Sequence, residues 1–344
     1  MAVLAGSVSS ALGTGGSTPI SAPAVFATPD SVALPHDALS DPSAGMDGID
    51  CLSPGNCVAV GRYNLGQAVA VSEVAGQWGT PSSVPLPTGW ASGNSGSGLH
   101  AVECSTLTAC VAVGQFDDAS HHQQALLARL ASGHWSTAVV ALPTGAASGN
   151  PLASLTAIDC PSSTSCSAVG YYSDSSGAQQ VMQVPISSGT AGTATQLDLP
   201  SGASSFTPAA SLLSISCASV GNCTAVGTVV DTNGENRAMA VSESSGSWSA
   251  AALLSPPSGA NPAANAPTSL NAVSCASSGN CVAGGTYVDG ASTNQVFVTT
   301  QVAGAWGSAR LLASSPKASI SNPKGSIETL SCTGESTCVA VGTI

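Results

Sequence analysis

A pair of cysteines separated by five residues recurs six times along this chain of 344 residues. The first copy reads "CLSPGNCVAVG", and the first cysteines of successive copies lie 53, 56, 57, 58 and 57 residues apart. Such a period predicts an array in which each copy is one structural unit. Every cysteine belongs to a pair: Cys51–Cys57, Cys104–Cys110, Cys160–Cys166, Cys217–Cys223, Cys275–Cys281 and Cys332–Cys338.

Each repeat contains four short segments typical of β-strands. The first ends at the first cysteine ("LHAVEC"), and the second starts at the second cysteine ("CVAVG"). An Asp-containing turn leads to a third segment such as "QAVAVSEV", and Gly-x-Trp opens the fourth, except in the third repeat, which lacks the Trp. Aspartate favours turns because its side chain bonds the local backbone. The turn aspartates are Asp118, Asp174, Asp231 and Asp289; the tryptophans are Trp78, Trp135, Trp248 and Trp306.

Four strands in about 56 residues indicate the blade of a β-propeller. "CVAVG" is apolar at every position, as expected of a strand covered on both faces. We therefore predict an all-β, six-bladed propeller of four-stranded blades spanning residues 25–344 as one domain. The last repeat stops after two strands, and "FATPDSVALP" (Phe26–Pro35) matches "WGTPSSVPLP" of the first repeat. N- and C-terminal strands are expected to close the last blade, with "MAVLAGSV" the one candidate for its third strand.

The N-terminal residues allow two interpretations. Residues 1–24 are a signal peptide or a flexible leader: "APA" at Ala22–Ala24 resembles a signal-peptidase site, but no Lys or Arg precedes Arg62. A start codon placed too far downstream would also explain the missing charge. No run of 18 apolar residues is present, so no transmembrane helix is expected.

The paired cysteines are interpreted as disulfides. Residues that face each other at the mouth of a hairpin have the separation that a disulfide needs. Zinc sites favour closer spacing with further ligands nearby, and a redox site would need one pair unlike the rest. Each bridge closes a seven-residue loop, worth about 2 kcal/mol in the chain-entropy account. Disulfides predict an oxidising compartment, hence a secreted or extracellular protein.

Charge excludes one class of partner. The net charge is −12 with six basic residues, so the chain cannot offer the basic surface that nucleic acid requires. The remaining expectation is a monomer that binds a glycan or a protein.

Candidate binding residues lie where the repeats differ. In a propeller the Asp turns and the long Pro/Gly/Ser loops share one face, opposite the cysteine hairpins, and binding residues commonly occupy such loops. The second repeat is the most unusual there, and an exposed Trp can stack on a sugar. In the alternative reading, Asp118 is an ordinary turn residue and the histidines are solvated. The predicted ligand-binding residues are Trp90, His100, Asp117, Asp118, His121 and His122.

A second candidate cluster precedes the first cysteine. Asp50, Glu103 and Asp159 occupy this position in three consecutive repeats, where the other three have serine. Innermost strands line the central channel of a propeller, so these carboxylates could hold Ca²⁺ or raise one another's pKa. The alternative is three separate, solvated carboxylates.

The repeats "CxxxxxCVAVGxYxDxxG…GxW…LP" resemble those of uncharacterised secreted, propeller-like proteins of actinobacteria, from about Phe26 to Ile344. This resemblance implies the fold and secretion but no activity. A more distant similarity to kelch and sialidase propellers rests on the Asp turns and Gly-x-Trp, although no repeat meets the sialidase Asp-box pattern.

The sequence favours a secreted, non-catalytic binding propeller that recognises glycan or protein at the cell envelope. Two alternatives stay open: a carbohydrate-active hydrolase or lyase with channel carboxylates, and a structural repeat scaffold. An enzyme should concentrate unlike polar residues in one or two blades, whereas a scaffold should stay regular.

Overall fold

The computed structural model describes residues 32–40, 43–64, 66–91, 96–260, 268–312, 325–334 and 337–343. These residues form two compact units, residues 32–196 and 197–343, which are described separately. The strands predicted to complete the last blade, at Phe26 and in "MAVLAGSV", lie outside the described residues. The prediction of one domain and of the closing blade therefore stays a prediction.

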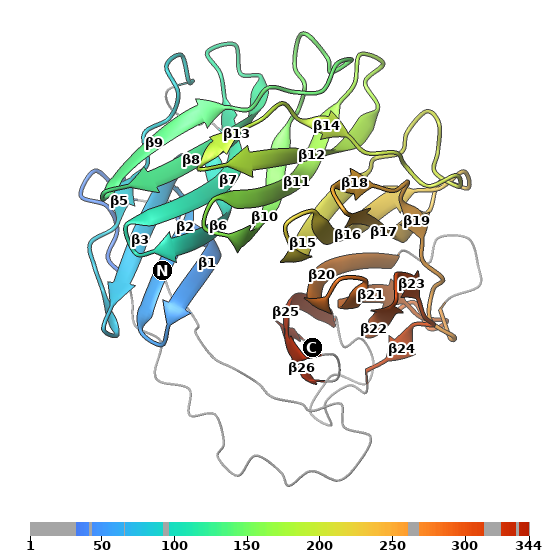
Figure 1. The fold of residues 1–344 in the computed structure, drawn as a ribbon. Helices are drawn as coiled ribbons and strands as arrows, with labels where there is room; N and C mark the ends of the chain where they lie inside the picture. Colours follow the sequence, from blue (N-terminus) through green and yellow to red (C-terminus); the bar gives the residue numbers. More distant parts are fainter. Residues whose placement is uncertain are drawn as a thin grey trace, which may run out of the picture. The chain divides into compact units, whose positions relative to one another are not determined.

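The first unit consists of three antiparallel sheets whose strands follow one another in chain order (Figure 1). We call them blades 1, 2 and 3. Blade 1 comprises β1 (Gly45–Ser53), β2 (Asn56–Tyr63), β3 (Gln67–Val74), β4 (Gln77–Trp78) and β5 (Ser82–Ser83). Blade 2 comprises β6 (Gly98–Thr106), β7 (Ala109–Asp117), β8 (Gln123–Ala131) and β9 (His134–Val139). Blade 3 comprises β10 (Ser154–Ser162), β11 (Ser165–Ser173), β12 (Gln179–Ser187), β13 (Thr190–Ala191) and β14 (Thr195–Gln196).

The second unit repeats this arrangement in blades 4 to 6. Blade 4 comprises β15 (Ser211–Ser219), β16 (Asn222–Val230), β17 (Asn236–Ser244), β18 (Ser247–Trp248) and β19 (Ala252–Leu253). Blade 5 comprises β20 (Thr268–Ser277), β21 (Asn280–Val288), β22 (Asn294–Val302), β23 (Ala305–Trp306) and β24 (Arg310–Leu311). Blade 6 has two strands among the described residues, β25 (Ser326–Gly334) and β26 (Thr337–Thr343).

The prediction of an all-β propeller fold is confirmed at the level of its blades. Five sheets carry four antiparallel strand positions, and each of the six sheets holds one disulfide. All twelve cysteines are bridged in the predicted C-x5-C pairs, and the two cysteines of a pair stand opposite each other across the first hairpin, as Cys51 and Cys57 do. No helix in the described part of the chain is long and apolar enough to cross a membrane.

The fourth strand differs from the single continuous segment that the sequence predicts. It runs unbroken in blade 2, as β9, but blades 1, 3, 4 and 5 split it into two short strands that both pair with the third. In blade 1 the N–H of Gly79 donates to the carbonyl of Ser72 (2.9 Å) at the break. The residue after the Trp position thus forms a bulge, which bends an edge strand while keeping most of its hydrogen bonds.

The final glycine of the "CVAVG" motif has a steric role. In blade 2, a Cβ built on Gly114 would lie 2.0 Å from the carbonyl oxygen of Gly98. The first strand has a register shift at this point, between Leu99 and Ala101, which presses its backbone against the second strand. Any side chain would force the two strands apart, so this position requires glycine.

Apolar side chains between adjacent blades form the core of each unit. One cluster joins blades 1 and 2 through Val58, Val60, Leu99 and Leu126. Another joins blades 2 and 3, and a third joins blades 4 and 5. Both faces of the second strand are therefore covered, which explains why "CVAVG" does not alternate polar and apolar residues.

Candidate functional site

In blades 2 to 5, the Asp turn meets the loop that precedes the blade. Isolated backbone bridges join Trp90 to Asp118, Ala146 to Asp174, Ala203 to Asp231 and Ala260 to Asp289. The cysteine hairpin lies at the other end of the same strands. We refer to the two ends of a blade as the Asp-turn end and the disulfide end.

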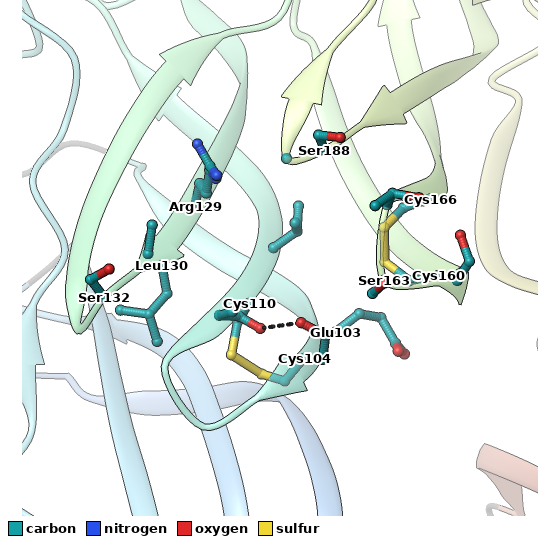
Figure 2. Close-up of a pocket in the computed structure, with 17 residues that line it drawn as sticks. Glu103, Cys104, Cys110, Arg129, Leu130, Ser132, Cys160, Ser163, Cys166 and Ser188 are labelled. Atoms are coloured by element: carbon teal, nitrogen blue, oxygen red, sulfur yellow. Dashed lines mark hydrogen bonds between the residues drawn. A yellow bond between two sulfur atoms is a disulfide. The ribbon is translucent and has the colours of Figure 1, made fainter.

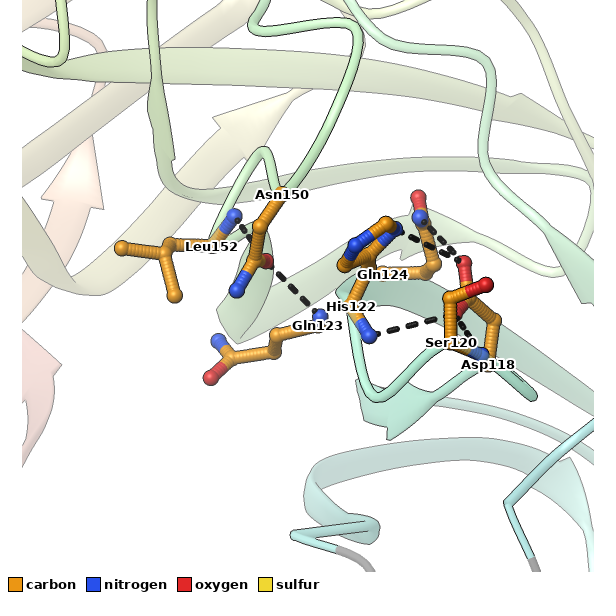
Figure 3. A network of polar contacts seen from close by, with 7 residues as sticks. All are labelled: Asp118, Ser120, His122, Gln123, Gln124, Asn150 and Leu152. Carbon is orange, nitrogen blue, oxygen red and sulfur yellow. Dashed lines mark hydrogen bonds and ion pairs between the residues drawn. The ribbon is translucent and has the colours of Figure 1, made fainter.

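The side chain of Asp118 stabilises the turn to which it belongs (Figure 3). Its Oδ1 accepts the N–H groups of Ser120 (2.9 Å) and His122 (3.1 Å), and its Oδ2 accepts the side-chain amide of Gln124 (3.0 Å). Burial opposes ionisation, but these N–H donors outweigh it and hold the pKa of Asp118 below its usual value. The other three turn aspartates accept the equivalent N–H groups, so this is a repeated structural device.

Three other predicted ligand-binding residues surround that turn. Trp90 is half-buried and packs against the apolar cluster between blades 1 and 2. His121 is exposed at a φ of 60°, and Nδ1 of His122 lies 3.8 Å from Oδ2 of Asp118. The contacts of Trp90 and His122 are thus structural, and a ligand-binding role for these residues stays a prediction.

His100 and Asp117 lie beside a separate hollow of about 380 Å³ between blades 1 and 2, which we call the loop-end hollow. His100 and Arg62 line it, and both face Asp47: the Arg62–Asp47 ion pair measures 2.7 Å and Nδ1 of His100 lies 3.9 Å from the same carboxylate. Burial lowers the pKa of His100, and the nearby Asp47 opposes that effect. The carboxylate of Asp117 accepts the N–H of Gly96 (2.9 Å).

The position before the first cysteine links consecutive blades. The Oδ2 of Asp50 accepts the N–H of Cys104 in the next blade (2.8 Å). Serine does the same in the second unit, where Ser216 accepts from Cys275 and Ser274 from Cys332, both at 3.0 Å.

The proposed calcium ligands were Asp50, Glu103 and Asp159. Within the described residues, no three His, Cys, Asp or Glu side chains converge closely enough to hold a metal ion. The structure thus gives Asp50 a backbone partner instead, and calcium binding stays a prediction.

Glu103 differs from its counterparts in the other blades. Its side chain makes no hydrogen bond to any residue that the structure describes, although Asp50 at the same position in blade 1 does. Burial, followed by the charges of Asp50 and Asp159, raises the pKa of Glu103 to about 8. Glu103 is therefore mainly a neutral carboxylic acid at pH 7, able to donate one hydrogen bond as well as accept.

Glu103 lies in a hollow of about 650 Å³ between blades 2 and 3, at their disulfide end (Figure 2). We call it the interblade hollow. Figure 2 shows Arg129 and Leu130 of β8 on one side and the Cys160–Cys166 disulfide with Ser163 on the other. Hydroxyl groups supply most of the polar lining: Ser105, Ser132, Ser162, Ser163, Thr164 and Ser188.

The missing Trp of the third repeat leaves a second open space next to the interblade hollow. Trp135 of blade 2 packs against the cluster between blades 1 and 2, and Trp306 against the cluster between blades 4 and 5. The Trp of one blade thus fills the gap toward the blade before it. Blade 3 has Ala191 at this position, opposite Ile186 as Trp135 is opposite Leu130. A side hollow of about 420 Å³ remains beside Ala191 and Arg129.

Arg129 is specific to blade 2. It pairs with Val111 across β7 and β8, and the residues in the corresponding register of blades 1, 3, 4 and 5 are Ser72, Pro185, Ser242 and Thr300. Its side chain lies against Gly189 of the β12–β13 turn, where an added Cβ would come within 2.7 Å of Cδ and Nε. Arg129 has no carboxylate partner in the part of the chain that the structure describes.

The structure therefore places the predicted site residues in separate locations. Trp90, Asp118, His121 and His122 belong to one turn, His100 and Asp117 to the loop-end hollow, and Glu103 alone to the interblade hollow. Arg129 and Ala191 were not among the predicted residues. The signals for both are visible in the repeat alignment, as a missing Trp and a single Arg at a position otherwise occupied by small residues.

Comparisons with known proteins show distant likeness to propellers. No protein-family model matches the chain, and no curated protein matches it. A lectin from Burkholderia pseudomallei aligns at 14% identity and a TM-score of 0.48, covering 83% of this chain and 74% of the lectin. The β-propeller domain of Swd1 from Myceliophteria thermophila aligns at 10% and 0.47, covering 87% and 83%. An α-L-arabinanase from Penicillium chrysogenum aligns at 10% and 0.44, covering 90% and 95%.

Proposed function

We propose that this chain is a secreted, non-catalytic propeller that binds a glycan, and that the interblade hollow is its binding site. The observation that carries the proposal is that two blade-specific residues line one hollow. Glu103 and Arg129 of blade 2 both line the interblade hollow, and Arg129 also borders the side hollow beside Ala191. A purely structural array has no reason to concentrate its departures from the repeat there.

The lining of the interblade hollow suits a saccharide. Sugars present hydroxyl groups around their edges and C–H groups on their faces. The serine and threonine hydroxyls, the Arg129 guanidinium and the neutral Glu103 offer hydrogen-bond donors and acceptors. Val111 and the Cys104–Cys110 and Cys160–Cys166 disulfides offer apolar contact. A volume of about 650 Å³ falls in the range of small-molecule sites.

Binding is favoured over hydrolysis because the hollow has a single carboxyl group. Glycoside hydrolysis generally needs two carboxyl groups that flank the scissile bond, one as acid and the other as base or nucleophile. Glu103 is the one acidic residue among those that line the interblade hollow, and the loop-end hollow is lined by none. A hydrolase built on paired carboxylates is therefore the weaker proposal.

Secretion is part of the proposal because of the disulfides. Six bridges in a chain of this length are expected where the compartment is oxidising. A glycan ligand at the cell envelope is consistent with such a location.

A glycan array with the labelled protein and two variants tests the proposed function. Ala191→Trp fills the side hollow that Arg129 borders and should abolish binding to every glycan that the wild type retains, by displacing Arg129. Trp90→Ala alters the Asp-turn end and should leave that binding intact. The proposal fails if the wild type binds no glycan, or if Ala191→Trp binds as the wild type does while Trp90→Ala does not.

A further inference from the structure

We infer that the interblade hollow recognises an acidic saccharide, whose carboxylate pairs with the guanidinium of Arg129. This inference rests on the proposed function and names the chemical class of its ligand. It follows from the position and the unpaired charge of Arg129 in a protein that is otherwise strongly acidic.

Arginine is scarce in this chain: two of the three arginines outside the hollow pair with a carboxylate, and the third, Arg310, is exposed on β24. Arg62 pairs with Asp47 at 2.7 Å, and Arg237 pairs with Asp231 at 3.3 Å. The whole chain has a net charge of −12, yet Arg129 has no carboxylate within ion-pair distance among the residues that the structure describes. Its guanidinium is left available for an acid supplied from outside.

The fold holds Arg129 so that it faces the hollow. Its stem crosses Gly189, where even one added carbon would collide with it, and it stands opposite Val111, which lines the same space. Fixing the stem in this way lowers the entropy lost when the guanidinium binds. A guanidinium presents two parallel N–H groups that match the two oxygens of a carboxylate, which is the strongest form of this contact.

Glu103 is the acidic group that lines the same space. Partial burial, followed by the charges of Asp50 and Asp159, raises the pKa of Glu103 to about 8, which favours its protonated form at neutral pH. A neutral Glu103 does not compete for Arg129 as a charged carboxylate would, and it can donate its own hydrogen bond to the ligand. The carboxylate of Asp50 is occupied by the N–H of Cys104.

A neutral saccharide would interact less strongly with Arg129 than an acidic one. It would desolvate the Arg129 guanidinium and return only hydroxyl hydrogen bonds to it. A carboxylate forms a bidentate, charge-assisted contact with a guanidinium, whereas a hydroxyl offers a neutral acceptor that interacts more weakly. We therefore expect an acidic sugar to bind about tenfold more tightly than the same sugar without its charge.

The test compares acidic sugars with their uncharged counterparts by isothermal titration calorimetry. The pairs are glucuronate and glucose, galacturonate and galactose, and N-acetylneuraminate and its methyl ester. At least one acid should bind about tenfold more tightly than its counterpart, with a preference that weakens as salt is raised. Arg129→Gln should remove this preference and change the affinity for the neutral member less than twofold. Arg310→Gln, which removes an exposed arginine of β24, serves as the control for net charge and should keep the preference.

Two results would overturn the inference in distinguishable ways. If neutral and acidic members bind equally, or if Arg129→Gln weakens both to the same degree, the acidic ligand is wrong while glycan binding stands. If no member of any pair binds and the array is also blank, the proposed function fails together with the inference.

Discussion

The side chain of Arg129 lies across Gly189 so closely that a Cβ on the glycine would be 2.7 Å from Cδ and Nε of the arginine. Two repeats thus meet at this contact, an arginine found in blade 2 and a turn glycine of blade 3. The equivalent turn of blade 2 contains Gly133, and a Cβ there would have no neighbour within 4 Å.

Gly189→Ala should weaken glycan binding by displacing Arg129. Both Gly189 (φ 75°) and Gly133 (φ 80°) have left-handed backbone conformations, so an alanine at either position adds strain of about 1–2 kcal/mol. Gly133→Ala is therefore the matched control for backbone strain. Calorimetric titration should show at least a fivefold weaker ligand affinity for Gly189→Ala and an unchanged one for Gly133→Ala. Equal affinities for both variants would contradict the role of the contact.

Glu103 should make the protein less stable as pH rises. Its pKa is raised from 4.5 to about 8 in the folded protein, so between these values the folded state binds more protons than the unfolded state. The free energy of unfolding then falls with increasing pH across this window. Glu103→Gln removes the effect and should be more stable than the wild type by about 1–3 kcal/mol at pH 9, with the difference shrinking toward pH 5.

Urea unfolding at several pH values measures this difference. Asp198→Asn, which neutralises an exposed carboxylate outside the hollow, is the control and should show no such trend. A constant difference between wild type and Glu103→Gln from pH 5 to pH 9 would refute the assigned pKa shift. For an acidic ligand, affinity should likewise decrease above about pH 8, where Glu103 gains its charge.

A second interblade hollow can be built between blades 1 and 2. Trp135→Ala should remove the side chain that fills this gap and cost about 2–4 kcal/mol of stability. Ser72 corresponds in register to Arg129, and Gly133 already offers the open space that an arginine stem needs. The double variant Ser72→Arg/Trp135→Ala should therefore bind the acidic saccharide with a stoichiometry above one, whereas Trp135→Ala alone should keep a stoichiometry of one.

Asp231 should stabilise its turn strongly because its side chain is 4% exposed and fully used. Its Oδ1 accepts the N–H groups of Asn233 (2.8 Å) and Glu235 (3.0 Å), and its Oδ2 pairs with Arg237. Asp231→Ala should lower the free energy of unfolding by about 2–4 kcal/mol. Asp231→Asn keeps the Oδ1 bonds and should lose about half as much; equal losses in thermal unfolding would show that the turn hydrogen bonds contribute nothing.

The blade could be predicted from the sequence because its rules are local. Two cysteines on facing strands fix a hairpin, an aspartate binds the N–H groups two and four residues later, and the glycine of "CVAVG" must lie against the strand before it. Each of these relationships involves residues that are close in the sequence or in adjacent strands. The bulge that splits the fourth strand was missed because it depends on the edge position of that strand rather than on a residue pattern.

The candidate site could be predicted only in part because it arises between two blades. The missing Trp of the third repeat is visible in the sequence, but the sequence does not tell which neighbouring blade that Trp faces. Glu103 and Arg129 lie 26 residues apart on β6 and β8, and they line one hollow only because blade 2 packs on blade 3. The sequence predicts binding at the Asp turns because the repeats differ most visibly there, whereas the hollow lies at the disulfide end.

The most direct test of this account is a crystal structure of the protein with its best-binding glycan. We expect the sugar between blades 2 and 3, with its acidic group beside the guanidinium of Arg129 and its ring against Val111 and the Cys160–Cys166 disulfide. A sugar bound instead in the loop-end hollow, beside Arg62 and His100, would contradict the assignment of the site.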